Sequence, residues 1–201
     1  MAKFVFNESK AVSNDAPKGG KKVLDSGVYT VTLNTVSQVV AKTGTEGLDF
    51  SFTVDGSEYP NMVYGVWTHK ADGTELFSAN MIQALMGLLG VKELTPYQKT
   101  IEIKDGTKTV TALKELDGKR VKIAIQKVLD FYNGDTTEKN EIKAFFDADT
   151  GKTYSELKSN SEAKQIKYYE KLKDKETDAY KKAMIDMEDE VDEDGEEDSL
   201  L

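Results

Sequence analysis

Residues 27–54 read GVYTVTLNTVSQVVAKTGTEGLDFSFTV. Apolar and polar side chains alternate over 28–36 and again, more strictly, over 48–54. Because successive side chains of a strand point to opposite faces of a sheet, this period of two predicts two half-buried β-strands. Phe50 and Phe52 fall on the apolar face of the second strand, so we expect both in the core.

The sequence that follows continues this β pattern and interrupts it with one helix. The predicted elements are strands over 62–69, 121–126 (extended toward Tyr132) and 141–146, a helix over 79–89, and a small hairpin over 100–112. Ser78 is the predicted N-cap of the helix and Gly90 its C-terminal stop. Three strands, a helix and two strands are the succession of an OB-fold. The order therefore predicts a mainly β protein built on an OB-fold-like five-stranded barrel with an inserted helix.

Composition divides the chain into four parts. Residues 1–24 carry five lysines and two acids among polar residues and glycines, which is typical of a flexible basic arm. Residues 25–150 hold the predicted OB-fold domain. Residues 151–185 begin with the capping-box pattern Thr-Tyr-Ser-Glu and are predicted to be helical. Residues 186–201 form an acidic tail that we expect to be disordered.

The tail accounts for the charge of the whole protein. The chain has 36 acids and 27 bases, a net charge of −9, and ten of the acids lie in the last sixteen residues, which contain no base. A polyanion of this density can compete for a cationic groove on the body or serve as a peptide for partner proteins. A tail that acts only through solubility is the alternative.

Composition also limits the chemistry and the compartment. The chain contains no cysteine, and no apolar run approaches the 18 residues of a membrane span. We therefore expect a soluble intracellular protein without disulfides. His69 is the only histidine and has no nucleophile elbow to serve. The segments around Thr150–Thr153 and Asp147–Lys158 fail as a phosphate loop and as a calcium loop. These patterns predict no enzyme activity, no metal and no cofactor.

Several short motifs resemble those of phage-encoded single-stranded DNA-binding proteins. They are Gly27-Val-Tyr-Thr-Val31, Lys42-Thr-Gly44, Asp55-Gly56, Leu89-Gly90-Val91, Leu116-Asp-Gly-Lys119 and Asn140-Glu-Ile-Lys143. The end of the chain, Glu196-Glu-Asp-Ser-Leu-Leu201, is similar to the tails of replicative single-strand binders, although related tails often end in an aromatic residue. The resemblance implies a protein that coats single-stranded DNA during phage DNA replication, recombination and repair, in the cytoplasm of the infected bacterial host.

The same resemblance implies a partner-binding role for the tail. Its tip would recruit replication and recombination proteins such as a polymerase, a helicase or a recombinase. The residues concerned are Asp194, Glu196, Glu197, Asp198, Leu200 and Leu201. In the absence of DNA the tail would occupy the DNA groove.

A groove for single-stranded nucleic acid needs flat rings for the bases and cations for the phosphates. Alternation places Trp67 on the face of its strand opposite Tyr64, which makes Trp67 the best candidate for an outward ring and leaves a buried tryptophan as the alternative. Phe145, next to the outward Lys143, is the second predicted ring-and-cation pair. The other candidate DNA contacts are Tyr132, Lys42, Lys70, Lys122, Gln126 and Lys127.

The leading hypothesis is sequence-independent binding of single-stranded DNA. The first alternative is a structural or protein-interaction module such as a virion or assembly factor, and the second is a nuclease or recombination accessory enzyme. The sequence leaves open whether residues 152–185 pack on the barrel or build a homodimer.

Overall fold

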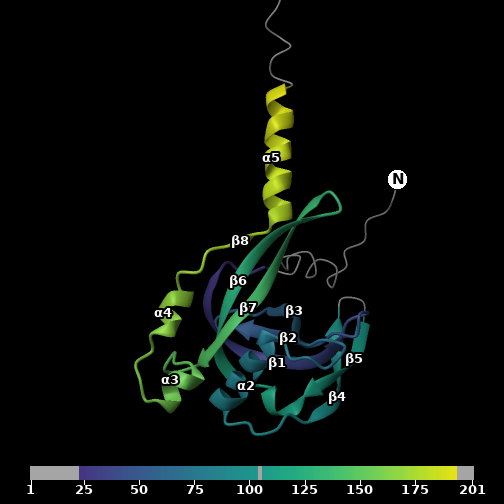
Figure 1. Ribbon diagram of the computed structural model, residues 1–201. Helices are drawn as coiled ribbons and strands as arrows, with labels where there is room; N and C mark the ends of the chain where they lie inside the picture. Colours follow the sequence, from purple (N-terminus) through teal and green to yellow (C-terminus); the bar gives the residue numbers. More distant parts are fainter. Residues whose placement is uncertain (1–22, 104–105, 194–201) are drawn as a thin grey trace, which may run out of the picture.

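The computed structural model describes residues 23–103 and 106–193 as a mainly β protein (Figure 1). The strands are β1 (Gly27–Val40), β2 (Glu46–Val54), β3 (Pro60–His69), β4 (Pro96–Ile103), β5 (Gly106–Leu113), β6 (Arg120–Tyr132), β7 (Asp135–Asp147) and β8 (Lys175–Glu176). The helices are α2 (Phe77–Leu89), α3 (Tyr154–Lys158), α4 (Gln165–Tyr169) and α5 (Asp178–Glu193), with a 3-10 turn at Lys114–Leu116. The strands expected from alternation are all present, and the expected hairpin is β4 and β5.

β1 holds the sheet together because three strands pair with it. β2 runs antiparallel to its residues 31–40, and β6 runs antiparallel to its residues 27–32. β5 meets it at a single position, Ser37 opposite Ala112. The sheet order is therefore β3-β2-β1-β5-β4, with β6 paired to the first half of β1 and β7 paired to β6. All pairings are antiparallel except a two-residue pair between β6 and β8.

The eight strands form one open sheet and not the closed five-stranded barrel that the sequence predicts. β3 and β7 pack against each other. Within the described residues, however, no backbone pairing joins them, since β3 pairs with β2 and β7 with β6. The mainly β class is thus confirmed and the closed barrel is wrong. The OB-fold itself remains a prediction.

One apolar core lies between the curved sheet and α2. Phe50 and Phe52 of β2 are fully buried in it, as predicted. Ile82 and Leu85 of α2 cover the same core from the helix side. Because a large core side chain costs about 3–5 kcal/mol when it is truncated to alanine, the phenylalanines of this cluster dominate the stability of the fold.

The two ends of α2 differ in how well the sequence predicts them. Gly90 ends the helix in the left-handed conformation (φ 66°), as predicted. The helix begins two residues earlier than predicted. Its N-cap is Leu76 and not Ser78; Leu76 has extended backbone and no side-chain cap, and Ser78 lies inside the first turn. Phe77 is therefore the first helical residue, at a position where its ring is left outside the core.

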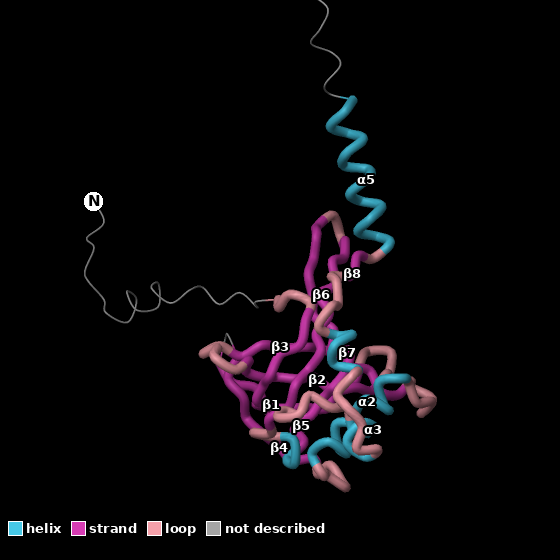
Figure 2. The backbone as a smooth tube through the Cα atoms, turned by 90° about the vertical axis from the view of Figure 1, so that its left-hand side faces the viewer, coloured by secondary structure: helices cyan, strands magenta, loops and turns pink. Residues whose placement is uncertain are grey.

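The capping box predicted at the start of the C-terminal segment is present in both its hydrogen bonds, between Thr153 and Glu156. Beyond it, α5 extends away from the sheet beside the β6–β7 hairpin, which both views of the backbone show (Figure 2). α5 continues to Glu193, so residues 186–193 are helical and the prediction of a disordered tail from residue 186 is wrong there. Apolar residues at helical spacing, Ala183 and Met187, carry the helix into the acidic sequence. Residues 194–201, with the predicted partner-binding side chains, lie outside the described part.

The N-terminal arm reaches the body at Leu24. The Leu24 N–H donates to Asn140 Oδ1 at 2.8 Å, and Asn140 Nδ2 donates to the Leu24 carbonyl at 2.7 Å. The Leu24 side chain packs against the core. Leu24 thus belongs to the domain and not to the arm, whose residues 1–22 lie outside the described part.

Candidate functional site

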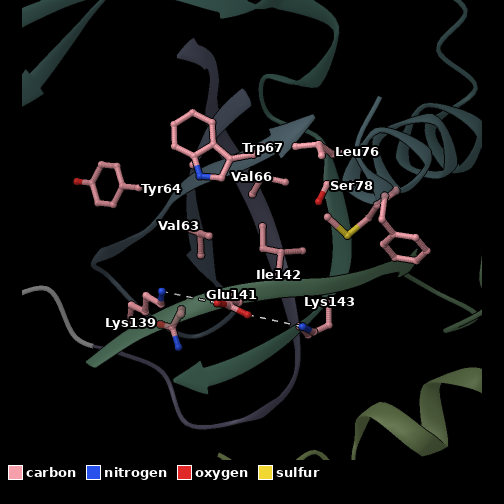
Figure 3. Close-up of a pocket in the computed structure, with 14 residues that line it drawn as sticks. Val63, Tyr64, Val66, Trp67, Leu76, Ser78, Lys139, Glu141, Ile142 and Lys143 are labelled. Carbon is pink, nitrogen blue, oxygen red and sulfur yellow. Dashed lines mark ion pairs between the residues drawn. The ribbon is translucent and has the colours of Figure 1, made fainter. Parts of the chain in front are cut away.

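A cleft of about 530 Å³ lies where β3 and β7 fail to pair. Its walls come from β3, from β7 and from the start of α2. In Figure 3, Tyr64 and Trp67 extend from β3 at the top of the view, and Lys139, Glu141 and Lys143 follow β7 below them. The cleft brings exposed rings and lysines together.

A β-bulge shapes the β3 wall. Leu48 pairs with Val66 and Phe50 with Val63, so Tyr64 and Gly65 together face the single residue Asp49. Gly65 adopts a left-handed conformation (φ 63°), and its N–H donates to Asp49 Oδ1 at 2.8 Å. The extra residue changes which side chains face the core, since a strand of strict alternation would bury every second residue. Val63 and Val66 are buried, three positions apart.

The Trp67 indole packs against the backbone of two glycines, Gly65 and Gly47. A β-carbon on Gly65 would lie 2.7 Å from the indole, and one on Gly47, the cross-strand partner of Trp67, would lie 2.8 Å from it. The ring therefore lies close to bare backbone, which fixes its position. Trp67 is half-buried, so part of the indole is accessible from the cleft. The structure thus supports an accessible ring over the fully buried alternative.

Two more aromatic residues line this cleft and were not predicted from the sequence. Tyr64 is 53% exposed and Phe77 is 85% exposed. The bulge removes Tyr64 from the core face on which strict alternation places it, and Gly65 was the only sequence signal for it. Phe77 is exposed because it occupies the first position of α2. Exposed large rings gathered in one concave site are typical of a binding surface.

The β7 wall is a row of charged side chains. Lys139 Nζ lies 3.8 Å from Glu141 Oε1, and Lys143 Nζ lies 3.6 Å from Glu141 Oε2 (Figure 3). All three side chains are partly exposed. Lys143, predicted as a DNA contact, lines the cleft; Lys139, which also lines it, was not predicted. Together these three side chains add one net positive charge to the lining of the cleft.

The predicted stacking role of Phe145 is wrong. The register of β7 shifts between Ala144, opposite Ala124, and Ile142, opposite Ile125, so Lys143 is an extra residue in a bulge. Beyond the bulge the alternation is reversed, and Phe145 points into the core, where it is 3% exposed. Its ring centroid lies 5.6 Å from that of Phe50.

Two predicted lysines lie in neighbouring loops near the end of β3. Lys42 and Lys70 are both exposed. Their loops are in contact, since a β-carbon on Gly44 would lie 2.9 Å from that of Ala71. Neither lysine lines the cleft, although Lys70 follows Trp67 by only three residues.

The other predicted contacts are held elsewhere. Lys122 donates to the Ala148 carbonyl, and Gln126 Nε2 donates to the Lys173 carbonyl at 3.1 Å. Lys127 forms a 2.9 Å ion pair with Glu138, and hydrogen bonding to that carboxylate raises the pKa of Lys127. Tyr132 is 69% exposed at the end of β6, next to the hairpin turn. None of these residues lines the cleft, so the structure does not bring them together with Trp67.

Three other features of the described residues concern metal binding, His69 and membrane insertion. The described side chains of residues 23–103 and 106–187 include no group of three or more histidines, aspartates or glutamates placed to bind a metal ion. His69 lies 4.0 Å from Glu75 and beside the Thr68 hydroxyl. Among the described helices, none is both long and apolar enough to cross a membrane.

Comparison with known proteins does not assign the chain to a family. No protein-family model matches the chain, and no curated protein matches its sequence.

Proposed function

We propose that this protein binds single-stranded DNA without sequence preference, with the cleft between β3 and β7 as its contact surface. The observation that carries the proposal is the joint presence of Tyr64, Trp67 and Phe77 with Lys139 and Lys143 in one cleft. Rings stack on any base, worth roughly 1–3 kcal/mol per base, and lysines hold the backbone phosphates. Since the described cleft lysines are few and partly paired, stacking supplies most of the affinity.

We further propose that the open sheet is an OB-fold. β1, β2 and β3, the following α2, and then β6 and β7 occur in the order of the five OB strands and their helix. The pairing of β1 with both β2 and β6 agrees with that topology. The β4–β5 hairpin is an insertion after the helix. On this view the cleft is the unclosed seam of the barrel.

The resemblance to phage single-stranded DNA-binding proteins supports a role for this surface in DNA replication, recombination and repair. The protein would coat displaced strands in the cytoplasm of an infected bacterium. Residues 194–201 would compete for the cleft and recruit a polymerase, helicase or recombinase when DNA displaces them. No catalytic step and no cofactor are needed for this role.

Titration of Trp67 emission tests the proposal, because Trp67 is the only tryptophan of the chain. We expect oligo-dT to quench the emission at low salt, duplex DNA of the same length to bind far more weakly, and added salt to release the oligonucleotide. Absence of any response to oligo-dT in dilute buffer, confirmed by a gel shift, would exclude the proposal and favour a structural or protein-interaction module. Magnesium-dependent cleavage of the DNA would instead favour a nuclease.

A further inference from the structure

The three charged side chains on β7, Lys139, Glu141 and Lys143, form two ion pairs that share Glu141. Lys139 and Lys143 each approach a different oxygen of the same carboxylate, Glu141. The two lysines are four residues apart along a strand, roughly 13 Å between their backbones. In the free protein both ammonium groups share the one Glu141 carboxylate, but the separation of their backbones lets the two long side chains reach different anions once they leave it.

We propose that Lys139 and Lys143 are two separate subsites for backbone phosphates and that Glu141 is the resident anion that both leave when DNA binds. This inference rests on the proposed function of the cleft and names the groups that hold the sugar-phosphate chain in it. The ligand chemistry of each subsite is a phosphodiester monoanion.

The energetics favour such an exchange. Ion pairs between partly exposed side chains contribute only about 0–1 kcal/mol, because water solvates both partners. Each lysine thus loses little when it leaves Glu141, and it gains a charge-assisted hydrogen bond to a phosphate oxygen. DNA binding also releases condensed counterions, a gain that the carboxylate does not offer.

Glu141 then lowers the affinity of the cleft for every polyanion. Its carboxylate competes for both ammonium groups in free protein, and it repels phosphates in the complex. The net effect is that binding depends on the stacking of bases as well as on charge. A polyanion without bases gains only the contacts between its anionic groups and the lysines, and it must still displace Glu141.

The chain contains a matched control on the same strand. Glu138 also pairs with a lysine, Lys127, at 2.9 Å, and neither residue lines the cleft. Glu138→Gln and Glu141→Gln change the net charge equally and each frees one or two lysines. Only Glu141→Gln frees lysines that line the cleft.

Fluorescence anisotropy of labelled oligo-dT with the full chain tests the assignment over a salt series. We expect Glu141→Gln to bind about threefold to tenfold more tightly than wild type at low salt, and Glu138→Gln to remain within about twofold. Lys139→Gln and Lys143→Gln should each flatten the plot of log affinity against log salt by about 0.7. Heparin, which offers charge without bases, should gain at least as much from Glu141→Gln as oligo-dT does.

The outcomes separate this inference from the proposed function. If wild-type protein binds oligo-dT but Glu141→Gln does not tighten binding beyond Glu138→Gln, the role of Glu141 is overturned while the function stands. Unchanged salt dependence in both lysine variants would overturn the two subsites. If neither wild type nor any variant binds oligo-dT at low salt, the proposed function fails and the inference with it.

Discussion

The indole of Trp67 rests against Gly65, two residues earlier in the same strand, so closely that a β-carbon at Gly65 would lie 2.7 Å from the ring. Gly65 is also the residue whose left-handed conformation forms the β3 bulge. One glycine therefore both exposes Tyr64 and leaves room for Trp67. The two rings of β3 at this cleft depend on the same local backbone.

Gly47→Ala should displace the Trp67 indole. The new β-carbon would lie 2.8 Å from the ring and 2.8 Å from the Val66 carbonyl, so both the side chain and the β2–β3 pairing must shift. We expect a change in Trp67 emission wavelength and weaker binding of oligo-dT. The control is Gly27→Ala, because a β-carbon there meets only Tyr29 at an ordinary 3.8 Å. Identical emission and affinity in the two variants would show that Gly47 does not position the ring.

Alanine substitution of each cleft ring should reduce DNA affinity more than stability. Trp67→Ala, Tyr64→Ala and Phe77→Ala are each expected to weaken oligo-dT binding by about fivefold to 150-fold, the equivalent of roughly 1–3 kcal/mol per stacked base. Phe77 is so exposed that its loss should leave the thermal midpoint nearly unchanged. Tyr132→Ala is the control, since Tyr132 is an aromatic residue exposed to solvent that lies outside the cleft. A larger loss from Tyr132→Ala than from the other three would place the DNA on the β6–β7 hairpin.

Alternation along the strands predicted many of the core residues and the succession of elements along the chain, but not the cleft. It placed Phe50 and Phe52 correctly because β2 pairs without a bulge that reverses their face. It failed at Phe145 because an extra residue in β7 reverses the faces, and nothing in the sequence around Lys143 marks that bulge. Whether a strand bulges depends on how it packs against its neighbours, which is a tertiary effect.

The cleft lies where the described strands β3 and β7 do not pair through their backbones. Three strands, a helix and two strands predict a closed barrel, and the sequence carries no signal that β3 and β7 stay apart. Sequence reasoning therefore found Trp67 and Lys143, each from its own strand, and missed Phe77 and Lys139, which belong to the site only through the three-dimensional arrangement.

Removal of residues 194–201 should strengthen DNA binding at low salt. This segment carries four acids and no base, and as a tethered polyanion it would compete with phosphates for the lysines of the cleft. The gain should disappear near 0.5 M salt, because screening removes it. A chain that lacks only Leu200 and Leu201 is the control, since it keeps all four acids and should bind like wild type. Equal affinities of all three forms at every salt concentration would argue against competition by the tail.

Phe145→Leu should destabilise the protein and leave its DNA affinity intact. The ring packs against Phe50 in the core, and its partial loss is expected to cost about 1–2 kcal/mol, with a lower urea midpoint. Affinity for oligo-dT, measured where both proteins are folded, should stay within twofold of wild type. A large drop in affinity without a loss of stability would restore the stacking role that the sequence predicts for Phe145.

The stability of the segment that contains α3 and α4 should depend on pH through Glu156. Its carboxylate accepts the N–H groups of Thr153, Lys164 and Gln165 at 2.8–2.9 Å, which joins α3 to the start of α4. Burial alone would raise the pKa of Glu156, but these backbone hydrogen bonds outweigh it and lower the pKa below the ordinary 4.5. Because the folded-state pKa is the lower one, the stabilisation is present above pH 4.5 and is lost as pH falls through the folded value.

Glu156→Gln should therefore lower the free energy of unfolding by about 2 kcal/mol at neutral pH, and the difference from wild type should shrink as the pH falls below 4.5. Urea unfolding at a series of pH values measures it, with Glu162→Gln, at an exposed position of the same segment, as the control. Since Tyr169 of α4 packs on Phe146 of β7 at 5.6 Å, the loosening of this segment in Glu156→Gln should also weaken oligo-dT binding modestly at neutral pH. A gap between wild type and Glu156→Gln that stays constant from pH 7 to pH 3 would mean that the carboxylate is not the group that titrates.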